Sequence, residues 1–184
     1  VEEQLLLAPY LTRIASSHNG LFESWLSGFS KTGEPLQTFA LLIRVNQRIY
    51  AEIAYRRREE EGVQSANETL EKSTGSCRDF ANLFIELVRA MGFAARFVSG
   101  YLYSDHLIEQ SGSTHAWAEV FLPGAGWKGF DPTIGQVVGE DHIAVAVARL
   151  PEAVPPIAGS FLGVTDSQMT VDVRVTALAE QEKV

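Results

Sequence analysis

Three residues of this sequence have the side chains of a thiol-based acyl-transfer site: Cys77, His115 and Asp131. Cys77 is the only cysteine, and the pattern around it places it in the first turn of a helix. Exposed backbone N–H groups and the positive end of the helix dipole favour a thiolate at such a position. A histidine can accept and return the proton, and a carboxylate can orient the imidazole and stabilise its charged form. The three residues together would suit nucleophilic attack on an acyl group.

The helix that carries Cys77 is predicted over about residues 76–91. Gly92 stands where a C-terminal cap belongs. The apolar residues within this range recur at helical spacing on one face, and they are Phe80, Leu83, Phe84, Leu87, Val88 and Met91. The nucleophile would therefore be held by a helix that packs on a core.

Strands are expected to carry the other two residues. His115 begins a strand-like run over 115–122, after a loop rich in serine and glycine. Asp131 follows a second run over 127–130 and precedes a proline. If these runs are adjacent antiparallel strands, His115 and Asp131 lie side by side.

Each of the three residues also has an ordinary structural interpretation. A cysteine in a helix is often a small buried apolar side chain. A single histidine is commonly a surface or hydrogen-bonded structural group, and Asp-Pro is a common opening of a turn. The other histidines, His18, His106 and His142, are expected to be structural or exposed. A metal site built on His106, His115 and His142 is the least favoured alternative, because their spacing matches no familiar ligand pattern.

The remaining segments predict an α+β domain. A helix is expected at about 36–50, and a short one starts at the capping sequence of Ser65 and ends before Gly75. The charged block 56–61, three arginines followed by three glutamates, is expected to be a solvated connection. Further strands are expected at 96–103, 143–149 and 169–177. Helices followed by strands with hairpin-length connections indicate an antiparallel sheet, and Arg96 and Glu119 are expected to pair between neighbouring strands.

Composition restricts the partners. The 184 residues are 46% hydrophobic and 21% charged, which is ordinary for a globular protein. With 15 Lys and Arg against 23 Asp and Glu, the net charge of −8 provides no basic excess for nucleic acid or an anionic membrane. No apolar run approaches the roughly 18 residues of a membrane-spanning helix, and one cysteine cannot form an internal disulfide. We therefore expect a cytoplasmic protein that binds neither nucleic acid nor membrane.

Four blocks of the sequence resemble the bacterial transglutaminase-like superfamily, and they occur in the order found in that family. They cover residues 75–150, about half of the chain. The weaker pattern at 36–55 extends the resemblance upstream. The blocks are Gly75-Ser76-Cys77-Arg78-Asp79-Phe80 with the strand up to Leu102, Thr114-His115-Ala116-Trp117, Gly126-Trp127-Lys128-Gly129-Phe130-Asp131-Pro132-Thr133, and Asp141-His142-Ile143.

The resemblance implies a papain-like fold, in which a nucleophile-bearing helix packs on an antiparallel sheet. It implies Cys77 as nucleophile, His115 as general base and acid, and Asp131 as the orienting carboxylate. No cofactor and no metal are expected. One domain is expected over residues 1–184, with its core at about 36–178. Many bacterial relatives carry a β-rich region upstream, and since position 1 is a valine we expect a fragment that lacks this region.

The expected activity is attack of Cys77 on the amide carbonyl of a peptide or protein, which forms a thioester. The acyl group then passes to water, as in a peptidase or amidase, or to an amine, as in a transglutaminase. A non-catalytic binding module that retains the fold is the alternative. The backbone N–H of Cys77 is expected to be one donor to the oxyanion, and the candidates for the second are Tyr50, Tyr55 and Trp25.

Overall fold

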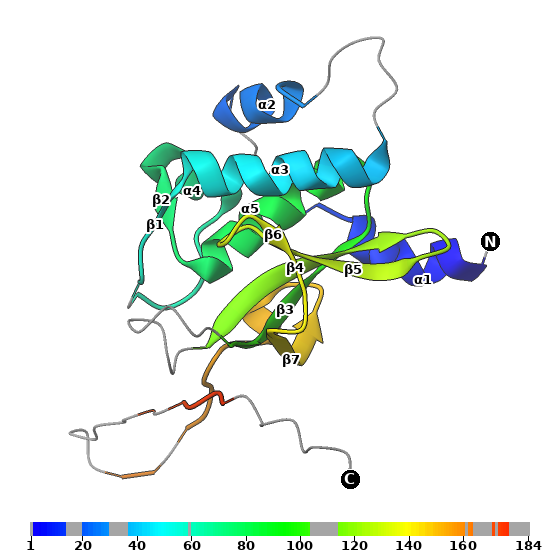
Figure 1. Cartoon of the computed structure of the whole chain (residues 1–184). Coiled ribbons are helices and arrows are strands. Elements are labelled where there is room, and N and C mark those ends of the chain that lie inside the picture. Colours follow the sequence, from blue (N-terminus) through cyan, green and yellow to red (C-terminus); the bar gives the residue numbers. More distant parts are fainter. Residues whose placement is uncertain are drawn as a thin grey trace, which may run out of the picture.

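The computed structural model describes residues 2–13, 20–29, 37–58, 60–103, 114–160, 162–163, 171 and 173–176. Figure 1 shows helices gathered over an antiparallel sheet. Within the described residues the main sheet has the strand order β6-β5-β4-β3-β7, and every neighbouring pair is antiparallel. Its strands are β3 (Ala95–Leu102), β4 (His115–Leu122), β5 (Gly126–Asp131), β6 (Gln136–Val137) and β7 (His142–Ala148). The expected α+β class is confirmed.

The helices precede the sheet in the chain. They are α1 (Glu2–Leu11), α2 (Gly20–Ser27), α3 (Thr38–Glu52), α4 (Ala66–Lys72) and α5 (Cys77–Ala90), and a 3₁₀ turn follows the sheet at Pro151–Ala153. A small parallel sheet pairs β1 (Ala54–Tyr55) with β2 (Thr74–Gly75), directly before α5. None of the helices in these described ranges is long and apolar enough to cross a membrane.

Helix α5 is the centre of the core. It packs on β3 and β4 with one side and against α3 and α4 with another, so nearly all of its side chains are buried. Several of its buried polar side chains form hydrogen bonds to neighbouring segments or within the helix. Asn82 donates to the carbonyl of Gln64 at 3.0 Å, and Arg89 contacts Glu86 at 3.4 Å and donates to the carbonyl of Ala95 at 2.8 Å.

The register of the sheet follows the sequence pattern closely. Arg96 on β3 lies opposite Glu119 on β4, and Arg96 Nε is 2.6 Å from Glu119 Oε2. The expected cross-strand pair is thus confirmed. β4 and β5 form a hairpin in which Ala118 faces Phe130, which brings the start of β4 and the end of β5 to the same end of the sheet.

Two helices were not expected. The apolar residues of α1 show no helical periodicity, Leu5 and Leu6 are each 72% exposed, and Pro9 lies inside the helix. The end of α1 is held by distant arginines: Arg149 Nε donates to the carbonyl of Pro9 at 2.6 Å, and Arg89 Nε donates to that of Tyr10 at 3.0 Å. Contacts remote in sequence thus stabilise α1. The other unexpected helix, α2, instead buries two aromatic side chains.

The expectation of a strand at 169–177 was wrong for the residues described there, 171 and 173–176, which form no strand. The alternation of valines at 171, 173 and 175 is typical of a strand, but a strand also needs a neighbour for its backbone hydrogen bonds. In the described sheet β7 is bonded to β3 alone. Local alternation was therefore insufficient to predict pairing.

Candidate active site

Cys77 is the first residue of α5, and Ser76 is the N-cap in extended conformation. The parallel pairing of Gly75 with Tyr55 fixes the chain just before it, and the backbone N–H of Arg56 donates to the carbonyl of Gly75 at 2.8 Å. Cys77 is 9% exposed. The expectation of a cysteine at the start of a helix is confirmed. Cys77 thus stands at the end of α5 where the backbone N–H groups of the first turn have no partner within the helix.

The carboxylate of Asp79 holds this segment in place. It accepts hydrogen bonds from the backbone N–H and the hydroxyl of Ser76 at 2.7 and 2.8 Å. It also accepts from the backbone N–H of Gln64 at 2.7 Å and from Arg58 Nη1 at 2.8 Å. Burial alone would raise the pKa of Asp79, but these hydrogen bonds outweigh it and lower the pKa. Asp79 is therefore a buried carboxylate that ties two loops to the start of α5.

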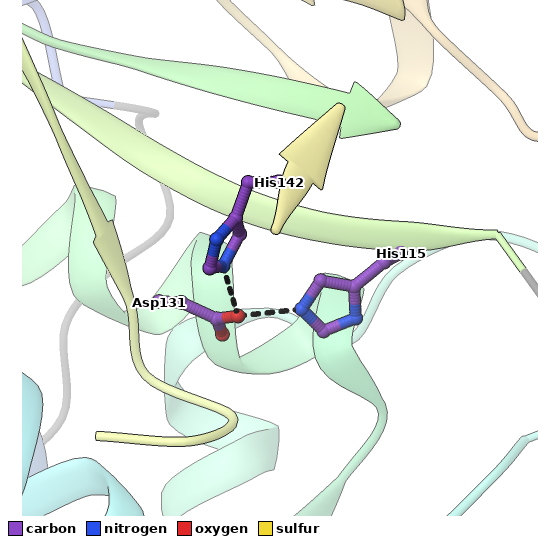
Figure 2. A group of neighbouring side chains, drawn as sticks. All are labelled: His115, Asp131 and His142. Atoms are coloured by element: carbon purple, nitrogen blue, oxygen red, sulfur yellow. Dashed lines mark hydrogen bonds and ion pairs between the residues drawn. The ribbon is translucent and has the colours of Figure 1, made fainter. Parts of the chain in front are cut away.

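His115 and Asp131 come together as the hairpin predicts. His115 is the first residue of β4 and Asp131 is the last residue of β5. His115 Nε2 lies 2.6 Å from Asp131 Oδ2 (Figure 2). Asp131 is fully buried and His115 is 7% exposed, so little water competes for this hydrogen bond.

Cys77 lies close enough to the same imidazole to interact with it electrostatically. Since Nε2 is bonded to Asp131, Nδ1 is the ring nitrogen left for the thiol. Burial by itself lowers the pKa of His115, but the hydrogen bond with Asp131 and the interactions with Asp131 and Cys77 outweigh it and raise the pKa to about 10. The structure therefore places His115 between Asp131 and Cys77, with a positively charged imidazole beside a buried carboxylate at neutral pH.

Asp131 has two further donors. The backbone N–H of Thr133 donates to Oδ1 at 2.9 Å, and His142 Nε2 lies 3.1 Å from Oδ2. Burial raises the pKa of Asp131, but hydrogen bonds from His115, His142 and Thr133 and the charge of His115 hold it well below its usual range. Asp131 is thus ionised and fixed at both oxygens.

His142 was expected to be structural or exposed, and its contact with Asp131 was missed. It is the first residue of β7, and its side chain is 4% exposed. The ligand atoms of His115, Asp131 and His142 all lie within 4.8 Å of one another. Two of the three histidines in the metal site considered from the sequence, His115 and His142, therefore lie close together. His106 lies outside the described residues, as does His18.

Among the candidates for the second oxyanion donor, Tyr55 lies close to Cys77. Its ring packs edge-on against Phe80 with centroids 6.3 Å apart. Burial raises the pKa of the Tyr55 hydroxyl, the interactions with Cys77 and Asp131 add to this effect, and Arg57 opposes it. Trp25 instead stacks under the guanidinium of Arg48 at 4.1 Å, on α2.

Two cavities lie near the start of α5, and Cys77 is not among the residues that line either of them. One, of about 520 Å³, is lined by Tyr55, Phe80 and Thr133 together with residues 50–54. The other, of about 650 Å³, includes Ser76 and Arg78, the two neighbours of Cys77 in sequence, and a wall of residues 155–157.

Comparison with protein families matches residues 29–132 to the core of the transglutaminase-like superfamily. The match covers more than half of the chain and includes Cys77, His115 and Asp131. The chain belongs to this superfamily. The resemblance inferred from the four sequence blocks is confirmed, and His142 lies beyond the matched region.

Several mycobacterial proteins are similar to this chain in sequence. The chain is 36% identical over 137 residues to the uncharacterized protein Rv2569c of Mycobacterium tuberculosis, which is 70% of this chain and 43% of that protein. It is 35% identical over 123 residues to the uncharacterized protein ML0607 of Mycobacterium leprae, 64% of this chain and 43% of that protein. The chain therefore spans less than half the length of these relatives.

Solved structures support the fold. A candidate cysteine protease from Cytophaga hutchinsonii aligns with a TM-score of 0.64 and 23% identity, over 90% of this chain and 58% of that one. The periplasmic domain of TgpA from Pseudomonas aeruginosa aligns with a TM-score of 0.52 and 24% identity, over 68% of this chain and 46% of that one. Calcium-bound LapG from Legionella pneumophila aligns with a TM-score of 0.53 and 15% identity, over 80% of this chain and 82% of that one. Since the TgpA domain is periplasmic, the fold gives no support to the cytoplasmic location expected from the sequence.

Proposed function

We propose that this protein is a cysteine enzyme that attacks the amide carbonyl of a peptide or protein through a thioester at Cys77. The observation that carries the proposal is one imidazole, that of His115, which is bonded to Asp131 at Nε2 and also interacts with Cys77. Membership of the transglutaminase-like superfamily supports it. A thiolate paired with an imidazolium is the reactive state of such sites.

In the first step the Cys77 thiolate bonds to the carbonyl carbon, and the carbonyl oxygen becomes an oxyanion. The oxyanion collapses, the C–N bond breaks, and His115 gives its proton to the leaving amine. The product is a thioester on Cys77 and a neutral imidazole. Asp131 favours the charged imidazole before this step and keeps the ring oriented during it.

In the second step His115 accepts a proton from water or from an incoming amine, which attacks the thioester carbonyl. Cys77 leaves as a thiolate, and a carboxylic acid or a new amide is released. His115 keeps the proton that it accepted, so the thiolate and the charged imidazole are restored. Hydrolysis and transfer thus use the same residues and differ only in the acceptor.

Two donors are available for the oxyanion. The backbone N–H of Cys77 lies in the first turn of α5, where it has no partner within the helix. The second candidate is Tyr55, whose ring packs against Phe80 of α5 and whose raised pKa keeps the hydroxyl protonated. A neutral phenol can donate a hydrogen bond to developing negative charge.

Intact-mass spectrometry with a glutamine-containing peptide library tests the proposal. Wild type should form an acyl adduct that is absent from Cys77→Ala. When a primary amine is added, a transamidated peptide assigns acyl transfer, and the hydrolysed peptide as the only product assigns hydrolysis. If Cys77 forms no adduct with any amide or with iodoacetamide while the folded protein retains peptides, the non-catalytic binding module is the better description.

A further inference from the structure

Asp131 lies between two histidines that come from different strands. His115 begins β4 and His142 begins β7, and both rings point at Oδ2 of the carboxylate (Figure 2), at 2.6 and 3.1 Å. We propose that His142 is a positioning residue, which holds the carboxylate of Asp131 in the orientation that binds His115. This inference rests on the catalytic role proposed for His115.

The tautomer of His142 follows from its second contact. The backbone N–H of Gly139 donates to Nδ1 of His142 at 3.3 Å. A nitrogen that accepts a hydrogen bond carries no proton, so the proton of the neutral ring is on Nε2. Nε2 therefore donates to Asp131 Oδ2. The backbone of the β6–β7 connection thus sets which nitrogen of His142 faces the carboxylate.

The donors around Asp131 fix its plane. Thr133 binds Oδ1 through its backbone N–H, and the two histidines bind Oδ2. Asp131 is fully buried, so rotation of the carboxylate would break hydrogen bonds that water does not replace. Without His142, Oδ2 would keep His115 as its one donor, and the carboxylate that orients His115 would be held by two hydrogen bonds instead of three.

The position of His142 is itself built into the sheet. The pairing of β3 with β7 shifts register between Ser99 and Gly100. A Cβ on Gly100 would meet the backbone carbonyl of Ile143, the residue after His142, and the side chain of Trp117. The ring of Trp117 also packs edge-on against His142 with centroids 5.2 Å apart. Gly100 therefore allows the start of β7 to approach closely enough for His142 to reach Asp131.

A divalent metal is the competing explanation for this cluster. Nε2 of each histidine lies in direct hydrogen-bond contact with Asp131 Oδ2, at 2.6 and 3.1 Å, so each histidine donates a proton to the carboxylate. A metal bound to Nε2 of His115 would remove its bond with Asp131. We therefore expect bound zinc to disrupt the hydrogen bonds between the two histidines and Asp131 rather than to stabilise them.

Two variants separate positioning from packing. His142→Leu removes the donor and keeps an apolar side chain beside Trp117, whereas the amide nitrogen of His142→Gln reaches about as far as Nε2. Acylation of Cys77 should slow by about 10-fold to 100-fold in His142→Leu and stay within about threefold in His142→Gln, a range typical of outer hydrogen-bond partners. Ile143→Ala, on the same strand with a 45% exposed side chain, is the control for a weakened β7. Equal losses in all three folded variants would overturn the proposal.

Isotope-labelled histidine in the wild-type protein gives a readout independent of turnover. At neutral pH the nitrogen spectra should show His142 protonated at Nε2 only and His115 protonated at both nitrogens. His142 protonated at Nδ1, or a zinc-dependent activity that His142→Gln abolishes, would overturn the proposal. Spectra as expected without any acylation of Cys77 would overturn the proposed function and leave the arrangement of the two histidines intact.

Discussion

The backbone N–H of Ser76 donates to Asp79 Oδ2 at 2.7 Å, so a buried carboxylate holds the residue directly before Cys77. The same spacing recurs at the start of α4, where Ser65 N–H donates to Glu68 Oε2 at 2.8 Å. The two contacts differ in their surroundings. Asp79 is fully buried and also binds Arg58 and Gln64, whereas Glu68 is exposed. The pair offers a direct comparison of one motif in two environments.

Asp79→Ala should destabilise the protein by about 2–4 kcal/mol, because it leaves buried N–H groups and the Arg58 guanidinium without their acceptor. Glu68→Ala removes the matching exposed contact and should cost about 1 kcal/mol or less. Urea unfolding followed by circular dichroism measures both. If the two variants lose equal stability, the buried network contributes no more than an ordinary helix cap.

The free energy of unfolding should depend on pH through His115 and Asp131. The pKa of His115 is raised from 6.5 to about 10, so its contribution is complete below pH 6.5 and is lost as the pH rises through about 10. The pKa of Asp131 is lowered from 3.8, so its contribution is present above pH 3.8 and is lost as the pH falls below that value. Urea titrations of wild type between pH 6.5 and 10 should show a decline that is flatter in His115→Gln. Parallel curves for the two proteins would contradict the shift.

Asp131→Asn should slow acylation of Cys77 by about 10-fold to 1000-fold, since the amide neither stabilises the imidazolium nor fixes its tautomer. Loss of the negative charge also lowers the pKa of His115, so the decline of the acylation rate at alkaline pH should move to lower pH. Rates of iodoacetamide alkylation and of peptide acylation across pH 5–10 measure both effects. An unchanged alkaline limb would mean that Asp131 has only a structural role.

Tyr55→Phe removes the proposed second oxyanion donor and keeps the ring against Phe80. It should lower kcat by about 10-fold to 100-fold with little change in KM, as expected for a contact made only in the transition state. Tyr50→Phe, in the same cavity, is the matched control and should stay near wild type. Should Tyr50→Phe show the loss and Tyr55→Phe retain activity, the donor assignment would be reversed.

The central residues of the site were predictable because each stands at the end of an element with a clear local pattern. The periodicity of α5 placed Cys77 in its first turn, and the two strands of the hairpin placed His115 and Asp131 at one end of the sheet. Short-range patterns therefore carried the geometry that a hairpin and a helix can transmit. The family blocks added the order in which these residues occur.

Arg58 and His142 could not be placed in the same way. Arg58 belongs to a charged block expected to be solvated, yet its side chain is 18% exposed and binds Asp79, 21 residues away. His142 reaches Asp131 from the start of β7, where the pairing with β3 shifts register and Gly100, which has no Cβ, allows close approach. Both contacts depend on how separate elements meet, and no local spacing encodes that.

The β4–β5 hairpin turns at residues 123–125, between Leu122 and Gly126. His115 and Asp131 stand at the opposite end of the same two strands, so the turn and the site are separated by the full length of the hairpin. Gly124 and Gly126 both have positive φ, which suits the turn to a short connection exposed to solvent. A biotin-acceptor peptide inserted there would anchor the protein to a surface with its cysteine facing away, and tethered protein could then capture thioester-linked substrates from a mixture.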